Sequence, residues 1–530
     1  MAEATWWQRG VIYQVYPRSF MDSDGDGVGD LPGILARLDH LTWLGVDAIW
    51  LSPIHPSPMD DFGYDVSDYL GVDPVFGTLD DLDRLVAAAH QRGLRVLLDW
   101  VPNHTSDQHP WFRASRSSRD DPKRDWYIWR DPSPGGGQPN NWLRYVGDSA
   151  WRWDERTGQY YYRVFLDSQP DLNWRNPQVQ EAMFDTLRFW LGRGIDGFRI
   201  DALVVLVEDD QLRDNPPNPS YRPGEDFPYM RELSVWNIDQ PETRELAARM
   251  RKVADELGDG RVLLAELGLP LEQIVAYYDG GDSDGIQLPF NFELLTTAWD
   301  ARVIAGYVDR YLAALPAGAW PNWVLGNHDT PRVASRLGPA QARVAAMLLL
   351  TLPGTPTLYQ GEELGLTDVP IPDAEALDPI ARLIPGRGRD PERTPMPWDA
   401  GPGAGFTSGR PWLPLGDDNL ARNLAAQRDD PASMLTLHRR LLQLRRQTPA
   451  LVTGAYQPVE AGGDLLAYLR AAPDGDPCLV ALNLGPDPAR LAVPSSVASG
   501  RVVLSTHPGR DGDAVDGSLE LAGDEGVVVR

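Results

Sequence analysis

Eight short apolar runs, each ending in polar residues, alternate along the chain with longer stretches of helical periodicity. A strand covered on both faces is apolar almost throughout, so such runs are typical of a parallel sheet. The intervening patterns, such as 178–193 and 241–257, supply the helical crossovers that parallel strands require. The sequence therefore predicts an α/β protein with a closed (β/α)₈ TIM barrel. The eight runs are residues 11–17, 47–53, 95–103, 196–201, 261–267, 285–291, 322–328 and 355–361.

Two segments break this alternation. Residues 105–175 follow the third run, are rich in Trp, Tyr, Gly, Pro and Asp, and carry a hairpin signal at Thr157-Gly158. An insertion of that length is a small domain rather than a loop. A second insertion, 365–412, follows the eighth run. Beyond a helix near 433–447, short strands and turns predict a C-terminal antiparallel β-sandwich domain over 453–530, which leaves 1–104 and 176–452 for the barrel.

The composition limits which binding partners and which cellular compartment we expect for this protein. The net charge of −27 repels nucleic acid and anionic lipid, so we expect neither nucleic acid nor a membrane as a partner. No stretch approaches the roughly 20 apolar residues of a membrane span. Cys478 is the single cysteine, and the opening residues MAEATWWQRG lack the pattern of a signal peptide, so we expect a cytoplasmic protein. The 19 Trp and 18 Tyr residues would suit sugar rings as well as protein cores.

Charged side chains gather where the predicted strands end. Arg199 and Asp201 lie two residues apart on one strand, so both point to the same face. Taken alone, this pair could be a structural ion pair or part of a site. Active sites of such barrels lie at the C-terminal ends of the strands, and many charges at that one rim favour a site. The others are Asp61, Tyr64 and Asp65 after the second strand, Asp99, Asn103 and His104 on the third, Glu266 on the fifth, and His328 and Asp329 on the seventh.

Ordered motifs carry a family resemblance. DWVPNH (99–104), GFRIDAL (197–203), AELGLP (265–270) and GNHDTPR (326–332) resemble the four signature regions of glycoside hydrolase family 13, the α-amylase family. QPDLNW (169–174) is similar to a fifth region as found in its oligo-1,6-glucosidase and α-glucosidase branch. Further similar segments are VIYQVYPRSF (11–20), GYDVSDY (63–69), LYQGEELG (358–365) and RTPMPWD (393–399). The resemblance implies a glycoside hydrolase acting on α-glucosides.

The chemistry of that reaction matches the carboxylates at the rim. Breaking an acetal between two sugars requires an acid for the leaving oxygen and a carboxylate that traps the oxocarbenium ion. Asp201 and Glu266 lie on neighbouring strands, where retaining enzymes need a separation of about 5 to 5.5 Å. Arg199 would keep Asp201 ionised as the nucleophile. Glu266, flanked by leucines, is the candidate acid and base.

The resemblance also assigns substrate-binding roles. It makes Asp329 the third carboxylate, which holds ring hydroxyls, and His104 and His328 neutral donors to glucose. The alternative for both histidines is a structural hydrogen bond to the backbone. Asp61 and Arg393 would close the pocket around the non-reducing glucose, and Tyr64 would stack beneath it. Phe165 and Gln169 are further expected contacts.

The acidic loop DSDGDGVGD (22–30) is a candidate cation site. Carboxylates separated by glycines can surround a hard cation, as at the start of an EF-hand loop. Gly33 occupies the twelfth position, where an EF-hand needs glutamate, so this is not an EF-hand, and an ordinary acidic loop is the alternative. The resemblance implies a structural Ca²⁺ and no organic cofactor. Its ligands would be Asp22, Asp24, Asp26, Asp30 and the carbonyl of Val28.

Four positions depart from the pattern of the branch. Gly268 replaces an aromatic residue, which predicts a wider acceptor side. Val146-Gly147-Asp148 replaces Phe-Gly-Gly, and Phe62 replaces asparagine at the expected rim of the pocket. Ala202 replaces the valine of relatives that favour α-1,6 bonds, which favours α-1,4 or mixed linkages.

Together these features predict a retaining, exo-acting α-glucosidase that releases glucose from maltose-like or isomaltose-like substrates, or from sucrose. A transglucosylase acting on sugar or alcohol acceptors is the main alternative, since it would use the same residues. An endo-acting amylase, a non-catalytic binding subunit and a barrel enzyme for phosphorylated substrates are less favoured, the last because YQGEELG supplies two acids where a phosphate loop would lie. We expect a monomer or a homodimer.

Overall fold

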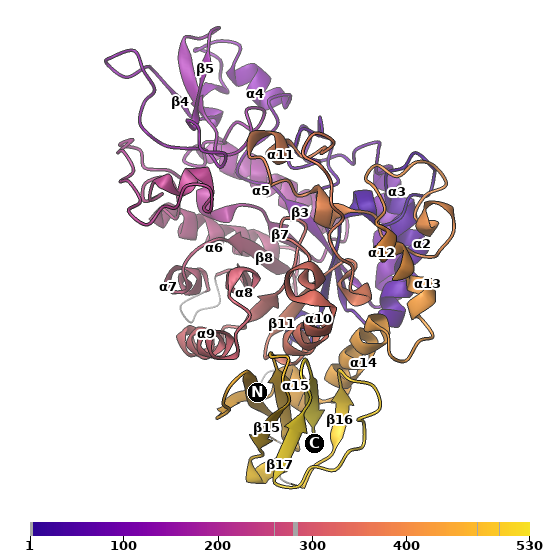
Figure 1. Ribbon diagram of the computed structural model, residues 1–530. Coiled ribbons are helices and arrows are strands. Elements are labelled where there is room, and N and C mark those ends of the chain that lie inside the picture. The colour runs from indigo at the N-terminus through magenta and orange to yellow at the C-terminus, as the bar shows by residue number, and fades with distance from the viewer. Residues whose placement is uncertain (1–3, 259, 279–284, 474, 498) are drawn as a thin grey trace.

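The computed structural model describes residues 4–258, 260–278, 285–473, 475–497 and 499–530. Residues 1–3, 259 and 279–284 of the predicted barrel and residues 474 and 498 of the predicted C-terminal domain lie outside the description. All eight predicted strands are present and form one parallel sheet in the order β10-β11-β1-β2-β3-β7-β8-β9. This confirms the predicted TIM barrel (Figure 1). The strands are β1 (Ile12–Val15), β2 (Ala48–Leu51), β3 (Arg95–Trp100), β7 (Gly197–Ile200), β8 (Val262–Leu267), β9 (Leu288–Asn291), β10 (Asn322–Val324) and β11 (Thr355–Tyr359).

The barrel closes between β9 and β10 through a side chain. Asn322 on β10 donates from its amide to the carbonyl of Pro289 and accepts a hydrogen bond of 3.4 Å from the N–H of Asn291. Asn322 is fully buried, so these bonds also satisfy a polar group that would otherwise be costly to bury. A side chain therefore joins the two ends of the sheet.

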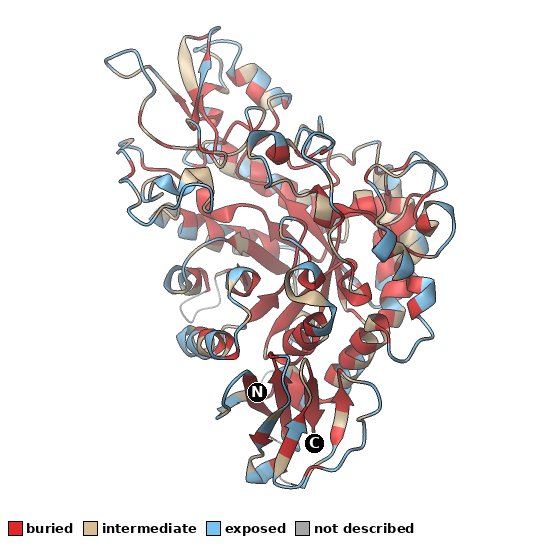
Figure 2. Ribbon diagram, viewed as in Figure 1, coloured by how far each residue is buried: buried red, intermediate tan, exposed pale blue. Residues whose placement is uncertain are grey.

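Amphipathic helices surround the barrel, and their inner faces are buried against the strands (Figure 2). Local sequence explains where two of these helices begin. Thr78 and Asp81 form a capping box at the start of one, and Asn176 caps another that begins with Pro177. The long helices are α2 (Leu31–Leu44), α3 (Leu79–Gln91), α5 (Pro177–Gly192), α6 (Pro241–Asp255), α9 (Ala301–Ala314), α10 (Val333–Thr351) and α14 (Met434–Gln447). The short ones are α1 (Trp6–Arg9), α4 (Pro110–Ser115), α7 (Leu271–Ile274), α8 (Glu293–Thr296), α11 (Pro379–Leu383), α12 (Asp417–Ala421), α13 (Leu424–Gln427) and α15 (Pro449–Thr453). Of the helices in the described residues, none combines the length and apolarity that crossing a membrane requires.

The segment after β3 carries its own antiparallel sheet, in the order β4-β6-β5. These strands are β4 (Trp129–Arg130), β5 (Trp151–Asp154) and β6 (Gln159–Tyr162), and β5 and β6 form the hairpin predicted at Thr157-Gly158. In Figure 1 this segment stands at the top of the barrel.

The last strands form a separate antiparallel unit at the opposite end of the molecule (Figure 1). Five strands pair in the order β12-β13-β14-β18-β16, and β15 pairs with β17. A buried arginine attaches the unit to the barrel: Arg470 of β13 donates to the carbonyl of Thr351, at the end of α10. The strands are β12 (Ala455–Val459), β13 (Leu465–Ala471), β14 (Cys478–Asn483), β15 (Ala489–Ala492), β16 (Val502–Ser505), β17 (Ser518–Leu521) and β18 (Gly526–Val529).

Candidate active site

One guanidinium holds three carboxylates at the C-terminal ends of β3, β7 and β8. Arg199 Nη1 lies 2.8 Å from Asp99 Oδ1 and 2.7 Å from Asp201 Oδ1, and Nη2 lies 2.6 Å from Glu266 Oε2. The alternation of side chains along β7 places Arg199 and Asp201 on one face, as the sequence predicted. We call Arg199, Asp99, Asp201 and Glu266 the Arg199 cluster.

The chain turns sharply after Asp201. Ala202 has φ of 47°, a left-handed conformation that costs a non-glycine residue on the order of 1 kcal/mol. This turn directs the Ala202 N–H at Glu266 Oε2, 3.1 Å away. Backbone strain is often retained at functional sites, where surrounding structure holds it in place. The turn thus helps to fix Glu266 beside Asp201.

Burial dominates the electrostatics of this cluster. It raises the pKa of Asp201 well above its ordinary value, although Arg199 opposes the shift, and it raises the pKa of Asp99 to about 6. Asp99 also accepts hydrogen bonds from Trp50 and from the hydroxyl of Tyr64. Arg199 thus acts on Asp201 in the direction that the sequence analysis expects, but burial acts against it.

A second cluster pairs carboxylates with two arginines. Arg389 Nη2 lies 2.7 Å from Asp61 Oδ1 and 2.9 Å from Asp378 Oδ1, and its Nη1 lies 3.2 Å from Asp329 Oδ1. Arg393 Nη2 lies 2.6 Å from the same Asp329 oxygen. Burial opposes ionisation here, but the charges of Arg389 and Arg393 hold the pKa of Asp329 well below its usual range, and Arg389 lowers that of Asp378 to about 2. We call Arg389, Arg393, Asp61, Asp329 and Asp378 the Arg389 cluster.

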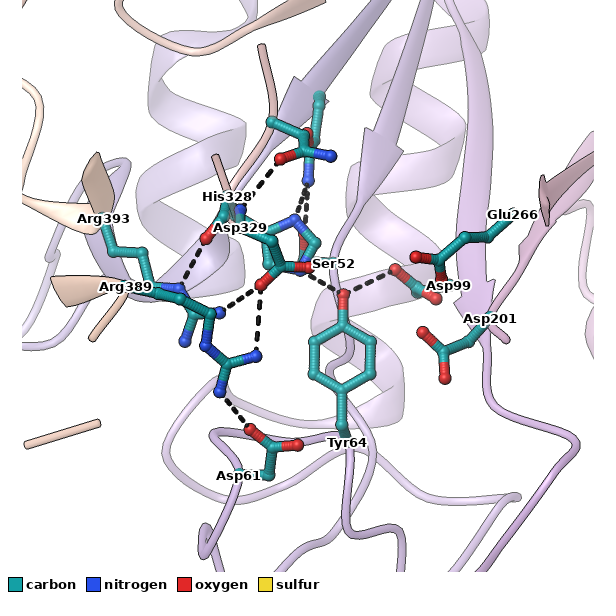
Figure 3. Close-up of polar contacts among 12 residues, drawn as sticks. Ser52, Asp61, Tyr64, Asp99, Asp201, Glu266, His328, Asp329, Arg389 and Arg393 are labelled. Atoms are coloured by element: carbon teal, nitrogen blue, oxygen red, sulfur yellow. Dashed lines mark hydrogen bonds and ion pairs between the residues drawn. The ribbon is translucent and has the colours of Figure 1, made fainter. Parts of the chain in front are cut away.

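Tyr64 and His328 connect the two clusters (Figure 3). The hydroxyl of Tyr64 donates to Asp99 Oδ2 at 3.1 Å and lies 2.6 Å from His328 Nε2, which is 3.4 Å from Asp329 Oδ2. Burial lowers the pKa of His328 to about 3, so the ring is neutral near pH 7. With Gln14 Nε2 2.8 Å from Nδ1, the neutral ring carries its proton on Nε2 and donates toward the site.

The remaining predicted residues occupy the same region with different partners. Gln169 donates to Asp61 Oδ2 at 3.1 Å, and Asp65 accepts the N–H of Asp61 at 3.0 Å, so both position Asp61. His104 is buried, and its Nε2 lies 3.1 Å from the carbonyl of Tyr64, which is the backbone contact considered as its alternative role. Phe165 packs on His104 with ring centroids 5.2 Å apart.

Sequence reasoning missed the partner of Asp61. It expects Asp61 and Arg393 to close the pocket and does not name Arg389, which contacts Asp61, whereas Arg393 contacts Asp329 and the carbonyl of His328. Three arginines, Arg387, Arg389 and Arg393, occur close together in a loop without periodicity, so the sequence carries no signal that ranks them. The sequence analysis placed Asp99 at the rim of the barrel. It could not show that Asp99 shares the Arg199 guanidinium with Asp201 and Glu266, because that contact joins three different strands.

Two of the positions that depart from the branch have different surroundings. A Cβ added at Gly268 would meet no atom within 4 Å, so the wider acceptor side stays a prediction with open space at this position. The ring of Phe62 packs on Trp412, with centroids 5.4 Å apart, and beneath the guanidinium of Arg18.

The acidic loop folds around its own carboxylates. Oxygens of Asp22, Asp24 and Asp30 approach one another within 4.8 Å, a spacing that fits a shared cation. Asp26 is outside this group and accepts the N–H of Val28 at 2.7 Å. Asp22 also accepts from Gly25 and Gly27, so the loop is partly ordered by its own hydrogen bonds. The donor set suits a hard cation, with Asp24 as its exposed member.

Comparison with known proteins identifies the family. The sequence profile described as "Alpha amylase, catalytic domain" matches residues 14–454. The chain belongs to the α-amylase family. Within it, the chain is 46% identical to a probable α-glucosidase of Rhizobium meliloti, covering 88% of this chain and 87% of that protein. It is 38% identical to an oligo-1,6-glucosidase of Parageobacillus thermoglucosidasius, covering 86% of each.

Solved structures of the family share this fold over the whole chain. The α-glucosyl transfer enzyme XgtA superposes with a TM-score of 0.92 at 43% identity and complete coverage of both chains. The trehalulose synthase MutB from Pseudomonas mesoacidophila superposes with a TM-score of 0.89 at 34% identity, again with complete coverage.

Proposed function

We propose that this protein is a retaining α-glucosidase that releases glucose from the non-reducing end of short α-glucosides. The observation that carries the proposal is the single Arg199 guanidinium that holds Asp201 and Glu266 side by side. Family membership and the α-glucosidase relatives support it.

In the first step, Asp201 attacks the anomeric carbon of the bound glucose. The bond from this carbon to the leaving oxygen breaks as Glu266 gives that oxygen its proton, and a glucosyl ester on Asp201 results. This step requires Asp201 as the attacking carboxylate and Glu266 as the acid. Arg199 contacts both groups and stabilises this arrangement.

In the second step, water attacks the anomeric carbon of the ester. Glu266, now ionised, removes the proton of the water, and Asp201 departs as a carboxylate. Two inversions at one carbon retain its configuration. The product is α-glucose, and both side chains return to their starting state.

The Arg389 cluster supplies the closed end of the site. Asp61 and Asp329 offer carboxylate oxygens to glucose hydroxyls, and two arginines keep these side chains in place. Neutral His328 adds a donor beside them. We infer that the ion pairs close this end around one terminal sugar, which favours exo-action over cleavage inside a long chain.

Transfer to a second sugar or an alcohol is the alternative on the same residues. The open space at Gly268 and the likeness to an α-glucosyl transfer enzyme favour it. An acceptor hydroxyl would replace water in the second step, and Glu266 would take its proton.

Product analysis tests the proposal. Maltose, isomaltose and sucrose are incubated separately with the protein, and the first products are followed by NMR. We expect α-glucose before mutarotation. Oligosaccharides formed faster than glucose would establish the transferase, β-glucose would exclude retention, and no product from any substrate would contradict both.

We propose that Asp22, Asp24 and Asp30 hold a structural Ca²⁺, together with the carbonyl of Val28. A bound cation links the loop to the start of α2, which Asp30 caps, and so stabilises the fold. Chelation should lower the melting temperature with little change in kcat at temperatures where the protein stays folded. Asp24→Asn should abolish the chelator effect, whereas Asp26→Asn, outside the group, should preserve it. An equal effect in both variants would contradict this ligand set.

We further propose a cytoplasmic protein, supported by the single, buried Cys478, and a monomer or homodimer. Cell fractionation and analytical ultracentrifugation test these two points. Recovery outside the cytoplasm, or a larger assembly, would contradict them.

A further inference from the structure

Gln14 places a carboxamide in the interior of the barrel. It lies on β1, a strand whose residues are all buried, and its own side chain is fully buried. Its amide nitrogen lies 2.8 Å from His328 Nδ1 and donates to Ser52 Oγ at 3.2 Å. Within the described residues, its Oε1 has no hydrogen-bond partner. Because an unpaired buried oxygen costs free energy, an apolar side chain of the same shape would be more stable here unless the N–H donors serve a purpose.

Tyr64 has a single proton for two partners. Its hydroxyl lies 3.1 Å from Asp99 Oδ2 and 2.6 Å from His328 Nε2 (Figure 3). When Nε2 carries a hydrogen, the ring donates to the Tyr64 oxygen, and the hydroxyl proton is available to Asp99. When Nε2 carries none, the ring accepts the hydroxyl proton, and Asp99 loses a donor. The tautomer of His328 therefore decides which group receives the Tyr64 proton.

Both ends of this chain of hydrogen bonds require the same tautomer. An amide N–H directed at Nδ1 requires that Nδ1 carry no hydrogen, which places the ring hydrogen on Nε2. Gln14 then donates to His328, and His328 donates to Tyr64. Tyr64 in turn donates to Asp99, so the three bonds point in one direction. Bonds aligned in this way polarise and strengthen one another.

Asp99 is the last acceptor of the chain. Burial raises its pKa to about 6, although the charge of Arg199 and the Tyr64 hydroxyl both lower it. Trp50 adds a further hydrogen bond to Asp99 Oδ2 at 3.2 Å. The loss of one donor would therefore raise the pKa of Asp99 further.

Charged and titratable groups surround both ends of the chain. Those that act on Asp99 are Arg199, Tyr64, Glu266 and Asp201. Those that act on His328 are Asp329, Arg393, Arg199 and Arg389.

We propose that Gln14 is a positioning residue: its amide N–H keeps the ring hydrogen of His328 on Nε2. The Tyr64 proton then points at Asp99 and keeps Asp99 ionised. This inference rests on the proposed function, because it assigns a residue that acts on the reacting groups of the same site. Arg199 Nη1 contacts both Asp99 and Asp201, so a neutral Asp99 would strengthen the hold of Arg199 on Asp201 and weaken the nucleophile.

Nitrogen NMR of protein with isotope-labelled histidine tests the tautomer directly. The chain has eight histidines, and the His328 signals are assigned by their loss in His328→Gln. In the wild type we expect Nδ1 to show the shift of a ring nitrogen without hydrogen, and Nε2 that of an N–H. In Gln14→Met, which keeps the length of the side chain and removes both donors, Nδ1 should become partly protonated. A wild-type ring with its hydrogen on Nδ1 would overturn the proposal, and this result needs no variant at position 14.

The pH profile of kcat/KM for maltose tests the link to Asp99. In Gln14→Met, Asp99 loses the Tyr64 donor in part of the molecules, so we expect the acidic limb to move up by about one pH unit. Ser52→Ala is the matched control, because it removes the other acceptor of the same amide and leaves the Nδ1 contact in place. Its ring signals and acidic limb should match the wild type. An acidic limb that stays in place in Gln14→Met, or that moves equally in both variants, would overturn the link.

The two measurements separate this inference from the proposed function, because the ring signals do not depend on turnover. The expected tautomer, lost in Gln14→Met, in a protein that hydrolyses none of maltose, isomaltose and sucrose would overturn the proposed function and leave the action of Gln14 on His328 standing. Turnover of maltose together with an unchanged His328 ring in Gln14→Met would overturn this inference alone.

Discussion

The two clusters of the site differ chiefly by one arginine. Each contains three carboxylates, but within the described residues the Arg199 cluster has one guanidinium and the Arg389 cluster has two. In the first, burial raises the pKa values of Asp201 and Asp99. In the second, the pKa values of Asp329 and Asp378 are lowered. The number of arginines thus separates the region of the reacting carboxylates from a binding region in which Asp329 and Asp378 are stabilised as carboxylates.

Removing either reacting carboxylate is the largest expected effect. Asp201→Asn and Glu266→Gln should each lower kcat by on the order of a thousandfold or more, with the circular dichroism spectrum unchanged. Asp196→Asn is the matched control: Asp196 is buried, contacts Arg95 and Arg261, and lies just before the other end of β7. That variant should lose stability and keep its kcat. Near wild-type turnover in either site variant would contradict the assigned pair.

Arg199→Lys should affect both turnover and stability. Lysine cannot reach three carboxylates with a planar fork, and the buried charges left unpaired should destabilise the fold by about 3 kcal/mol. We expect kcat to fall about a hundredfold in protein that is still folded. Urea denaturation and steady-state kinetics measure the two effects. A change in KM alone would show that Arg199 only binds substrate.

Arg389→Lys should act mainly on binding. The ion pair between Asp329 and Arg393 remains in this variant, whereas Asp61 loses its ion pair with the Arg389 guanidinium. We expect KM for maltose to rise about tenfold with kcat reduced less than about threefold. A fall in kcat as large as that of Arg199→Lys would erase the distinction between the clusters.

The two clusters should respond to pH with opposite signs. Asp99 has a folded pKa of about 6, above its unfolded value, so its stabilising contribution is present at low pH and is lost as pH rises toward 6. Asp378, at about 2, contributes stability above its unfolded pKa and loses it as pH falls toward 2.

The matched pair Asp99→Asn and Asp378→Asn measures this smaller effect. As the pH rises from 4 to 7, the wild type should lose on the order of 3 kcal/mol of its free energy of unfolding relative to Asp99→Asn. Asp378→Asn should show no such change between pH 4 and 7. Its free energy of unfolding should stay below that of the wild type in this range, and the difference should shrink only below pH 4. Parallel curves for both variants would contradict the assigned pKa directions.

Local patterns made the barrel predictable. Each strand is a separate apolar run, and alternation along β7 placed Arg199 and Asp201 on one face. The C-terminal strands β12, β15 and β17 were not predicted individually, because β12 and β15 are largely exposed, β12 contains Pro458, and β17 buries only alternate residues. Side-chain contacts between distant segments, such as the closure through Asn322 and the contact of Arg389 with Asp61, depend on packing that no local pattern records.

The central claim is that Asp201 becomes covalently glucosylated beside the acid Glu266. A fluorinated glucosyl fluoride, which slows hydrolysis of the ester, allows the intermediate to be trapped, digested and located by mass spectrometry. The account predicts one added glucosyl group on the peptide that contains Asp201. A label on the Glu266 or Asp329 peptide, or turnover of the reagent without a label, would contradict it.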